Sequence, residues 1–520
     1  MRLAPVAAVA LPVLAAHAAP LAESTCQKTE VVILGAGIAG LTAAKTLADH
    51  NVNDFVVLEY QDRVGGRLHN VTFAKHTVEA GANWVHGPGT PEGHINPIWT
   101  MVQKAGLKTV TTDEDDNSMY DHTGPTDYSA VFERAENANK LVFADAGDIL
   151  KSNYQDRTHR AGLRLQDWNP AKNDPAAQLA DWFIWDWDAA APPEVSSEVF
   201  GTISINATYN YFSHSDEFIC DPQGYVHAVW EDVKSAFEGH PERLRLRTKV
   251  TEIKHDADSV TVTSADGHCV TAKYAIVTFS VGVLQKKDAV RFIPELPAWK
   301  TRAIAGFEMG TYIKIFLEFE TSFWDSKQFL LYADPHVRGN YPIFQPLDLE
   351  GLYPGSNILV ATVIGEIAYR IESQSNEETA AQIIQVLENM YGKGVVSTLK
   401  DISYTRWDQE DWSYGSYSYW PPSTSLQAHQ NMRANVDSVF FAGEATSQEF
   451  FGYVQGGYYE GKHVAEFLAG CLTAPDPEQC ALNPDQKRYP VLTGVTPYDM
   501  YNPENGWYIY DEDLGVPGHA

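Results

Sequence analysis

A glycine-rich turn between an apolar strand and a helix constrains this chain more than any other segment. Residues 29–41 read TEVVILGAGIAGL, which contains the pattern Gly35-x-Gly37-x-x-Gly40. Gly35 permits a tight turn after the strand, and Gly37 lets the backbone approach a pyrophosphate. Gly40 lets the following helix, expected from Ile38 to His50, pack closely on the sheet. The turn therefore predicts the first β-α unit of a dinucleotide-binding domain.

A second apolar strand supports this interpretation because it ends in an acid. Residues 56–59 read VVLE, and Glu59 stands about where an acid can accept a hydrogen bond from a ribose 2′-hydroxyl. The pyrophosphate would lie at the helix N-terminus, where unpaired N–H groups and the helix dipole favour negative charge. The pattern alone leaves NAD and FAD open as ligands.

Further motifs narrow the choice of ligand. Residues 63–67 (RVGGR) follow the second strand, residues 83–87 read NWVHG, and residues 439–446 and 452–461 read VFFAGEAT and GYVQGGYYEG. Taken alone, Gly65-Gly66 is also consistent with a hairpin turn. Together these segments resemble the flavin amine oxidases, and most closely the secreted polyamine oxidases. The resemblance spans residues 28–470 and implies an α/β fold in which a Rossmann-like FAD domain is interleaved with an α+β substrate domain.

The resemblance assigns FAD contacts to residues throughout these motifs. They are Gly35, Gly37, Ile38, Ala39, Gly40, Glu59, Arg63, Gly66, Arg67, Ala82, Asn83, Trp84, Val250, Trp407, Gly443, Glu444, Gly452, Tyr453 and Val454. Gly452 to Val454 should open a helix whose N-terminal dipole faces the flavin. Residues 448–451 (QEFF) lack the cysteine that tethers flavin in monoamine oxidases, so we expect noncovalent FAD.

The same resemblance suggests catalytic and substrate-binding residues. Lys314, within the apolar strand pattern of residues 311–319, corresponds to the family lysine that holds a water near the flavin. Tyr417 and Tyr453 correspond to two rings that enclose the substrate nitrogen, and aromatic faces attract amines. His86 would bind substrate or relay a proton, and Asp188 would balance a distal charge of a long cation. Each residue also has an alternative interpretation without a catalytic role. The lysine would be an outward-facing solvated residue, the two tyrosines and the histidine would be ordinary core residues, and Asp188 would be a solvated loop acid.

These residues predict FAD-dependent oxidation of a polyamine (spermine, spermidine or an acetylated form) at a carbon beside a secondary amine. The reaction would use O2 and release an aldehyde, an amine and hydrogen peroxide. Oxidation of monoamines or L-amino acids is the alternative within the family, and loop arginines such as Arg164 keep the amino acid option open. A non-catalytic secreted flavoprotein is the alternative of a different class. Intact Lys314, Tyr417 and Tyr453 argue against it.

The charge of the chain agrees with a cationic substrate but does not demand one. There are 68 acidic and 38 basic residues, which gives a formal net charge of −30. Such a surface repels nucleic acid and attracts cations, although acidity also serves solubility alone. We expect O2 and a small polyamine as partners, no nucleic acid, no membrane, and a monomer or weak dimer.

The pattern of elements predicts that the chain passes twice between two domains. The FAD-binding domain is expected to comprise residues 28–95, 244–295 and 401–475, and the substrate-binding domain residues 96–243 and 296–400. Residues 244–253 and 259–263 alternate like half-buried strands, and 274–279 form a continuous apolar run. Residues 379–390 are expected to form an amphipathic helix. Residues 476–520 are expected to form a C-terminal tail.

Processing signals complete the sequence-based expectations. Residues 1–19 resemble a secretory signal with an Ala-x-Ala cleavage site, so we expect a secreted protein. Asn70 and Asn206 stand in glycosylation sequons. Cys471 and Cys480 enclose a short loop and could form a disulfide in an oxidising compartment, a pairing that the sequence leaves open. The remaining three of five cysteines, Cys26, Cys220 and Cys269, cannot all be paired. No cysteine or histidine spacing suggests a metal.

Overall fold

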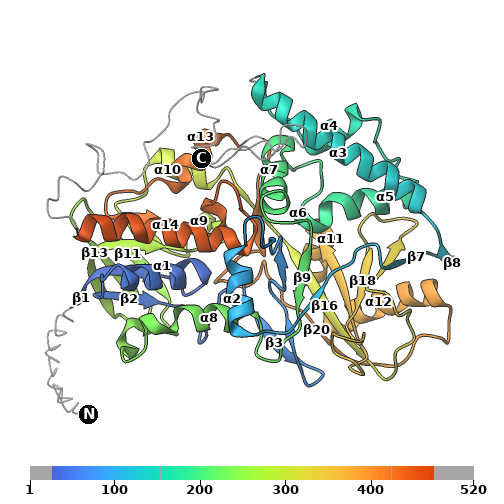
Figure 1. The fold of residues 1–520 in the computed structure, drawn as a ribbon, viewed down its shortest axis with the longest axis horizontal. Coiled ribbons are helices and arrows are strands. Elements are labelled where there is room, and N and C mark those ends of the chain that lie inside the picture. Colours follow the sequence, from blue (N-terminus) through green and yellow to red (C-terminus); the bar gives the residue numbers. More distant parts are fainter. Residues whose placement is uncertain (1–25, 153, 423, 474–520) are drawn as a thin grey trace, which may run out of the picture.

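The computed structural model describes residues 26–152, 154–422 and 424–473 of the 520-residue chain. Two large sheets lie towards opposite ends of the long axis, with α1 and α14 on one and α12 on the other (Figure 1). The predicted signal peptide and tail, together with Cys480, lie outside the described residues. The division into two domains at the expected boundaries stays a prediction.

The first sheet contains the glycine turn and has eight strands. Their order is β10 (Leu244–Arg245), β2 (Phe55–Leu58), β1 (Gln27–Leu34), β13 (Cys269–Val277), β12 (Val260–Ser264), β11 (Val250–His255) and β14 (Arg291–Ile293), with β22 (Val439–Phe441) beside β13. The pairs β10–β2, β2–β1, β1–β13 and β13–β22 are all parallel. Helices cover the sheet, so residues 31–34 of β1 and residues 275–277 of β13 are wholly apolar and buried.

Two helices meet in close contact beside this sheet. These are α1 (Ile38–Asp49) and α14 (Val454–Thr473). A Cβ added to Gly461 would lie 2.1 Å from the Ala39 carbonyl oxygen, and one added to Gly457 would lie 2.8 Å from the Ile38 side chain. Glycines one helical turn apart therefore let α14 approach the first turn of α1, which places the start of α14 near the glycine turn.

The second sheet is mixed and lies on the other side of the molecule (Figure 1). Its order is β20 (Leu399–Ser403), β16 (Tyr312–Phe319), β19 (Ile358–Ile364), β18 (Ile343–Pro346), β17 (Phe329–Ala333), β7 (Asn117–Asp121) and β8 (Gly124–Thr126). Residues of α11 (Gly365–Glu372) and α12 (Asn376–Tyr391) share a hydrophobic core with it. Ser375 and Glu378 form a capping box that starts α12, as such pairs commonly do.

Smaller elements join the two sheets. Strands β5 (Trp84–His86), β9 (Asp216–Ile219) and β6 (Thr109–Thr111) form a third sheet, while β3 (Asn70–Phe73) pairs with β4 (His76–Glu79) and β15 (Glu308–Gly310) with β21 (Tyr417–Tyr419). The remaining α-helices are α2 (Pro97–Ala105), α3 (Ser129–Lys151), α4 (His159–Leu165), α5 (Pro175–Asp181), α6 (Trp187–Ala189), α7 (Glu198–Tyr209), α8 (Tyr225–Val233), α9 (Val281–Gln285), α10 (Ala298–Ile304) and α13 (Leu426–Arg433). The single turns are η1 (Trp182–Asp186), η2 (Lys234–Ala236), η3 (Pro241–Arg243) and η4 (Glu444–Thr446).

The expected α/β class and Rossmann-like first unit are confirmed, with one local correction. Residues 244–253 were expected to form one strand, but they contain all of β10 and the start of β11, which lie towards opposite edges of the first sheet. The chain turns between them at Arg247, whose φ is +54°. Alternating side chains thus indicated strand character but carried no information about this break.

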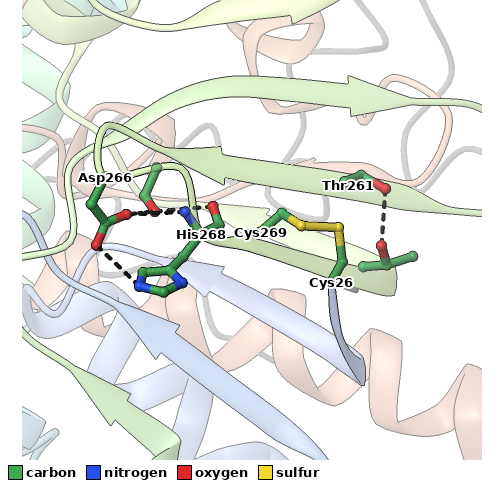
Figure 2. The surroundings of a disulfide bond; sticks show 7 residues. Cys26, Thr261, Asp266, His268 and Cys269 are labelled. Carbon is green, nitrogen blue, oxygen red and sulfur yellow. Dashed lines mark hydrogen bonds and ion pairs between the residues drawn. A yellow bond between two sulfur atoms is a disulfide. The ribbon is translucent and has the colours of Figure 1, made fainter. Parts of the chain in front are cut away.

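A disulfide that sequence reasoning left unassigned ties the N-terminal strand to the middle of the first sheet (Figure 2). Cys26 bonds to Cys269, 243 residues away, beside the register pair Gln27 and Val270 of β1 and β13. Cys220 is a free, buried thiol. The pair was not predictable from spacing, because only the parallel pairing of β1 and β13 brings the two residues together.

The described residues bear on three further expectations. Asn206 is 7% exposed within α7, so the burial of its side chain does not favour a glycan at this sequon, and glycosylation there stays a prediction. Asn70 is partly exposed. In the described part of the chain, no helix is long and apolar enough to cross a membrane, and no group of His, Cys, Asp or Glu is arranged to hold a metal.

The disulfide yields a stability prediction. We expect the double variant Cys26→Ser/Cys269→Ser to lose about 2–5 kcal/mol of unfolding free energy, because the bond closes a very long loop in the unfolded chain. Urea unfolding of the parent and the variant would measure the difference. The parent under reducing conditions should behave like the variant, and equal stability of all three would contradict the prediction.

Candidate active site

One large cavity of about 580 Å³ runs from the glycine turn to the second sheet. Its size is typical of a small-molecule site. Every predicted site residue lines it except Gly40 and Arg63. The cavity therefore brings the expected cofactor residues and the expected catalytic residues into one continuous space.

The end beside the glycine turn has the geometry of a nucleotide site. Gly35 adopts φ +112°, where a side chain would be strained, and a Cβ there would lie 2.5 Å from Thr278 Oγ1. A Cβ on Gly37 would have no neighbour closer than 4.0 Å, so the space beside Gly37 is open. Gly37 is the N-cap of α1 and supplies no side-chain cap. The first N–H groups of α1 are therefore available to an anion.

Glu59 lies at the end of β2 and is 5% exposed. Its carboxylate accepts hydrogen bonds from the backbone N–H groups of Ala36 (2.6 Å) and Gln61 (2.8 Å). Burial nevertheless raises the pKa of Glu59, against the effect of these donors. The carboxylate thus fixes the glycine turn and faces the cavity where a ribose would lie.

Gly40 and Arg63 act behind the cavity wall rather than on its surface. A Cβ on Gly40 would lie 1.9 Å from the Gly35 carbonyl oxygen, so Gly40 lets α1 approach the turn as its position predicts. The Arg63 guanidinium donates to the carbonyl oxygens of Gly66 (3.0 Å), Val64 and Leu68 (both 3.3 Å). Arg63 thus supports the Gly65-Gly66 loop from behind the cavity wall, and its direct contact with the cofactor stays a prediction.

Glu444 joins this loop to the catalytic end of the cavity. Its carboxylate accepts from Arg67 Nη1 (2.8 Å), Ser418 Oγ (2.6 Å) and the Gly452 N–H (2.8 Å). The three donors belong to the loop after β2, to β21 and to the segment that precedes α14. One carboxylate thereby sets the relative positions of Arg67, the Tyr417 strand and the Tyr453 turn.

Lys314 is 7% exposed on β16 and reaches the cavity from the second sheet. Its ammonium donates to the Gly81 carbonyl oxygen and to Asn83 Oδ1 (2.7 Å), and lies 5.9 Å from the centre of the Trp84 ring. Burial lowers the pKa of Lys314 to about 7, against the opposing charge of Glu79. The lysine is thus held in place with a labile proton near neutral pH, and it is not a solvated strand residue.

His86 stands opposite Asp216 in the antiparallel pair of β5 and β9. His86 Nδ1 lies 3.1 Å from Asp216 Oδ1 and 3.0 Å from the Tyr209 hydroxyl, which also donates to Asp216 Oδ2 (3.0 Å). Burial acts to lower the pKa of His86, but Asp216 outweighs it and the pKa is raised. A carboxylate only accepts, so the pairing places a proton on Nδ1 and leaves Nε2 for other partners.

Two further carboxylates share this end of the cavity. Asp188 and Glu114 are solvent-accessible through the cavity but are surrounded by protein. Desolvation raises the pKa of Asp188 to about 6 and that of Glu114 to about 8, and Asp216 adds to both shifts. Three acids that repel one another in a partly dehydrated space favour the arrival of positive charge.

A buried ion cluster supports the segment that carries Asp188. Arg338 donates to Asp186 (2.6 and 2.7 Å) and to Asp181 (2.7 Å), and Asp181 also accepts from Arg160 Nη1 (2.8 Å). These acids flank or belong to η1, a π-helical turn directly before α6. The turn is short and widened, as is common near functional sites, and it directs Asp188 into the cavity.

Aromatic side chains form the walls between the acids and the nucleotide end. The Tyr453 ring lies 5.2 Å from that of His86, and Tyr417 donates its hydroxyl hydrogen to the Asp188 carbonyl oxygen (2.9 Å). A Cβ on Gly452 would lie 3.6 Å from the Tyr417 ring, so the two predicted tyrosines are neighbours. Trp407 is 2% exposed and lines the cavity. Its ring packs edge-on against that of Trp412, with 5.6 Å between the ring centres.

The residues fit a bound FAD. The open space at Gly37, the free helix N-terminus and Glu59 match a pyrophosphate and a ribose, and a Cβ on Gly66 would project to 3.4 Å from Gly37 Cα. The catalytic end adds Lys314, Tyr417 on β21 and Tyr453, the residue before α14. The cavity-lining residues that would hold such a group are Gly35, Gly37, Ile38, Ala39, Glu59, Gly66, Arg67, Ala82, Asn83, Trp84, Val250, Trp407, Gly443, Glu444, Gly452, Tyr453 and Val454.

Sequence reasoning missed several residues of this site. Glu114 and Asp216 have no motif around them, and only strand pairing places Asp216 beside His86. Tyr312 was identifiable, because it stands two residues before Lys314 on the same strand and therefore on the same face. Its hydroxyl accepts a hydrogen bond from Trp187 Nε1 (2.8 Å), and both residues line the cavity.

Comparison with known proteins agrees with this geometry. The family model described as flavin containing amine oxidoreductase matches residues 38–468. Polyamine oxidase 1 of Zea mays is 37% identical over 85% of this chain and 90% of its own length, and polyamine oxidase 7 of Oryza sativa subsp. japonica is 34% identical over 84% and 93%. A putrescine oxidase bound to putrescine has a TM-score of 0.67 at 18% identity, covering 85% of this chain and 99% of its own. Cyclohexylamine oxidase from Brevibacterium oxydans has a TM-score of 0.65 at 19% identity, with the same coverage of both chains.

The Glu444 network yields a prediction on cofactor retention. In Glu444→Gln an amide N–H₂ group replaces one acceptor among three donors, so we expect a loss of about 1–3 kcal/mol in stability and weaker FAD retention. Thermal unfolding and flavin fluorescence after gel filtration would measure both. Ser418→Ala removes one donor without leaving the carboxylate unpaired and should have a smaller effect, whereas full FAD retention in Glu444→Gln would contradict the prediction.

Proposed function

Because this chain belongs to the flavin-containing amine oxidoreductase family, we propose that it oxidises polyamines such as spermine and spermidine, or their acetylated forms. O2 is the co-substrate, and the products are an aldehyde, an amine and hydrogen peroxide. The plant relatives bear the name polyamine oxidase, and the likeness to them covers most of both chains. The observation that carries the proposal is the cluster of Asp188, Glu114 and Asp216 at the catalytic end of the cavity.

These three acids suit a substrate with several separated positive charges. A buried cation needs counter-charges, because the low dielectric of a narrow cavity makes unpaired charge costly. Burial raises the pKa of Asp188 to about 6 and that of Glu114 to about 8, against the opposing charge of His86. A bound ammonium would lower both pKa values, so polyamine binding should release protons near neutral pH.

Bound FAD supplies the redox chemistry, as it takes an electron pair from the carbon beside the reacting nitrogen and delivers it to O2. The chain's own residues position the substrate and handle protons. Tyr417 and Tyr453 would flank the amine and exclude water from it. Lys314 holds a proton on Nζ whose pKa is lowered by burial to about 7. His86, with its Nδ1–H directed at Asp216, can accept an ammonium proton on Nε2.

The alternative substrates have less support in the cavity. Amino acid oxidases need an arginine for the substrate carboxylate, but Arg164 bonds to Asn169 (3.1 Å) and lies outside the cavity. Among the described cavity residues the one arginine is Arg67, which pairs with Glu444. No described cavity residue is a cysteine, which supports noncovalent FAD.

Export is part of the proposal. The Cys26–Cys269 disulfide begins seven residues after the expected signal peptide of residues 1–19 and joins two strands of the first sheet. Stable disulfides form in oxidising compartments. The disulfide thus supports secretion after cleavage of the signal peptide, with Asn70 as the more exposed of the two sequons for a glycan.

The acidic cluster makes a prediction about substrate preference. We expect Asp188→Asn and Glu114→Gln each to raise the KM for spermine by about tenfold, the equivalent of about 1.4 kcal/mol of lost ionic contact. The KM for a simple monoamine should stay within about twofold. Peroxide release at varied substrate concentration gives both constants, and Asp115→Asn, an exposed acid outside the cavity, is the matched control. Equal losses for the monoamine would remove the acids from polyamine recognition.

The His86–Asp216 pair makes a prediction about pH. Activity should rise with pH, because the reacting nitrogen must be neutral and a cationic His86 cannot take its proton. Asp216→Asn keeps a hydrogen-bond acceptor but removes the charge that raises the pKa of His86. We therefore expect the acid limb of kcat to move down by about one pH unit or more. Tyr209→Phe leaves the Asp216 carboxylate in place and should shift the acid limb of kcat less. An unshifted acid limb in Asp216→Asn would refute the pairing of His86 with Asp216.

A further inference from the structure

A second, very small cavity lies behind Lys314. Its volume is about 10 Å³, and its polar wall consists of Glu79, Asn83, Lys314, Gln345 and Tyr353. Lys314 and Asn83 also line the large cavity, whereas Glu79 lines the small one alone. Lys314 therefore stands between the large cavity and this small chamber, whose polar groups nothing in the proposed reaction yet uses.

Glu79 projects an unsatisfied oxygen into this part of the molecule. The residue ends β4 and is 5% exposed. Its Oε1 accepts the Tyr225 N–H (2.6 Å), but its Oε2 is fully buried and has no hydrogen-bond partner in the described structure. A buried carboxylate oxygen without a donor is costly and rare. The chamber is about the minimum size for one water molecule, and it offers several polar groups to bind it.

Lys314 has a hydrogen to spare for such a water. An ammonium has three N–H donors, and two of them are directed at the Gly81 carbonyl oxygen and at Asn83 Oδ1. Burial brings the pKa of Lys314 down to about 7 and that of Glu79 up to about 7, each opposed by the charge of the other. The two groups therefore exchange protons in the same pH range.

We propose that Glu79 is a positioning residue that controls the charge of Lys314 through one water buried between them. The proposal rests on the proposed function, because it gives Lys314 a part at the catalytic end of the cavity. The proton leaves Glu79 Oε2, passes through the water by breaking and forming one O–H bond, and binds Lys314 Nζ. A neutral acid and a neutral amine become a carboxylate and an ammonium, so the net charge of the buried pair does not change.

Few other ionisable groups act on this pair. Arg63 adds a positive field at Glu79. The phenols of Tyr225 and Tyr353 are near Glu79, but their hydroxyl hydrogens are donated to the carbonyl oxygens of Trp84 (3.2 Å) and Thr77 (2.9 Å). Glu79 is the one ionisable group that shifts the pKa of Lys314 through its charge. Burial has the largest effect on the pKa of Lys314, and the charge of Glu79 is therefore the electrostatic control that opposes it.

The pH titration of the flavin absorption band in the resting holoenzyme tests the proposal without substrate. We expect a spectral change near neutral pH in the parent as Lys314 changes charge, and none in Lys314→Met. In Glu79→Gln the midpoint should fall by about one pH unit or more, because the anion that favours the ammonium is gone. Tyr353→Phe changes the chamber wall but no charge and should keep the parent midpoint. An unshifted midpoint in Glu79→Gln, or no spectral change in the parent, would overturn the proposal.

A second measurement covers the case in which Glu79→Gln does not fold. In Lys314→Met, Glu79 loses its cationic partner and its folded-state pKa rises further above the unfolded value. A raised carboxyl pKa stabilises the fold at low pH and loses that contribution as pH rises through the folded pKa. The melting temperature of Lys314→Met should therefore fall between about pH 5 and 8 more steeply than that of Lys314→Met/Glu79→Gln. Equal slopes would overturn the proposal, whereas failure to oxidise polyamines would refute the function and leave both titrations valid.

Discussion

The active end of this molecule depends on one buried carboxylate that holds together segments far apart in the chain. Glu444 accepts hydrogen bonds from Arg67, Ser418 and the Gly452 N–H, and thereby joins the Gly65-Gly66 loop, β21 and the turn before α14. Each of these segments presents a group to the cavity. Without the Glu444 carboxylate, the donors on these three segments would lose their shared acceptor. Buried donors without partners are unfavourable, and water would not replace the carboxylate once a ligand fills the cavity.

The nucleotide end was predictable from the sequence because its physics is local. Gly35, Gly37 and Gly40 lie within one turn, and each meets the steric demand expected at its position. The catalytic end was predictable only where a motif or a strand period marked it. Asp216 and the Cys26–Cys269 bond depend on the register of strands that are distant in sequence. No local pattern encodes such a register, so neither was found. Tyr312 was also missed, although its spacing to Lys314 on the same strand was a signal that could have found it.

The net charge of the protein and the charge of its cavity are separate matters. The chain carries a formal charge of −30, yet the nucleotide end of the cavity includes Lys249, Lys286 and Lys287 among its lining residues. The acids Asp188, Glu114 and Asp216 act on one another at the opposite end. Acidic groups are thus concentrated at the catalytic end, whereas lysines and acids are mixed at the nucleotide end, a distribution that overall acidity alone neither predicts nor supplies.

This site contains two pairs of a basic group and a carboxylate, His86 with Asp216 and Lys314 with Glu79. The carboxylate favours the charged form of the base in both pairs, but the outcome differs. His86 directly contacts Asp216, so the carboxylate holds one ring nitrogen protonated and raises the pKa. Lys314 and Glu79 act at longer range, and burial dominates the pKa of both. The first pair retains charge at the substrate, whereas the second stays close to the balance between its charged and neutral forms. A group close to that balance changes charge at small energetic cost, and this property suits a residue beside a cofactor that changes charge during turnover.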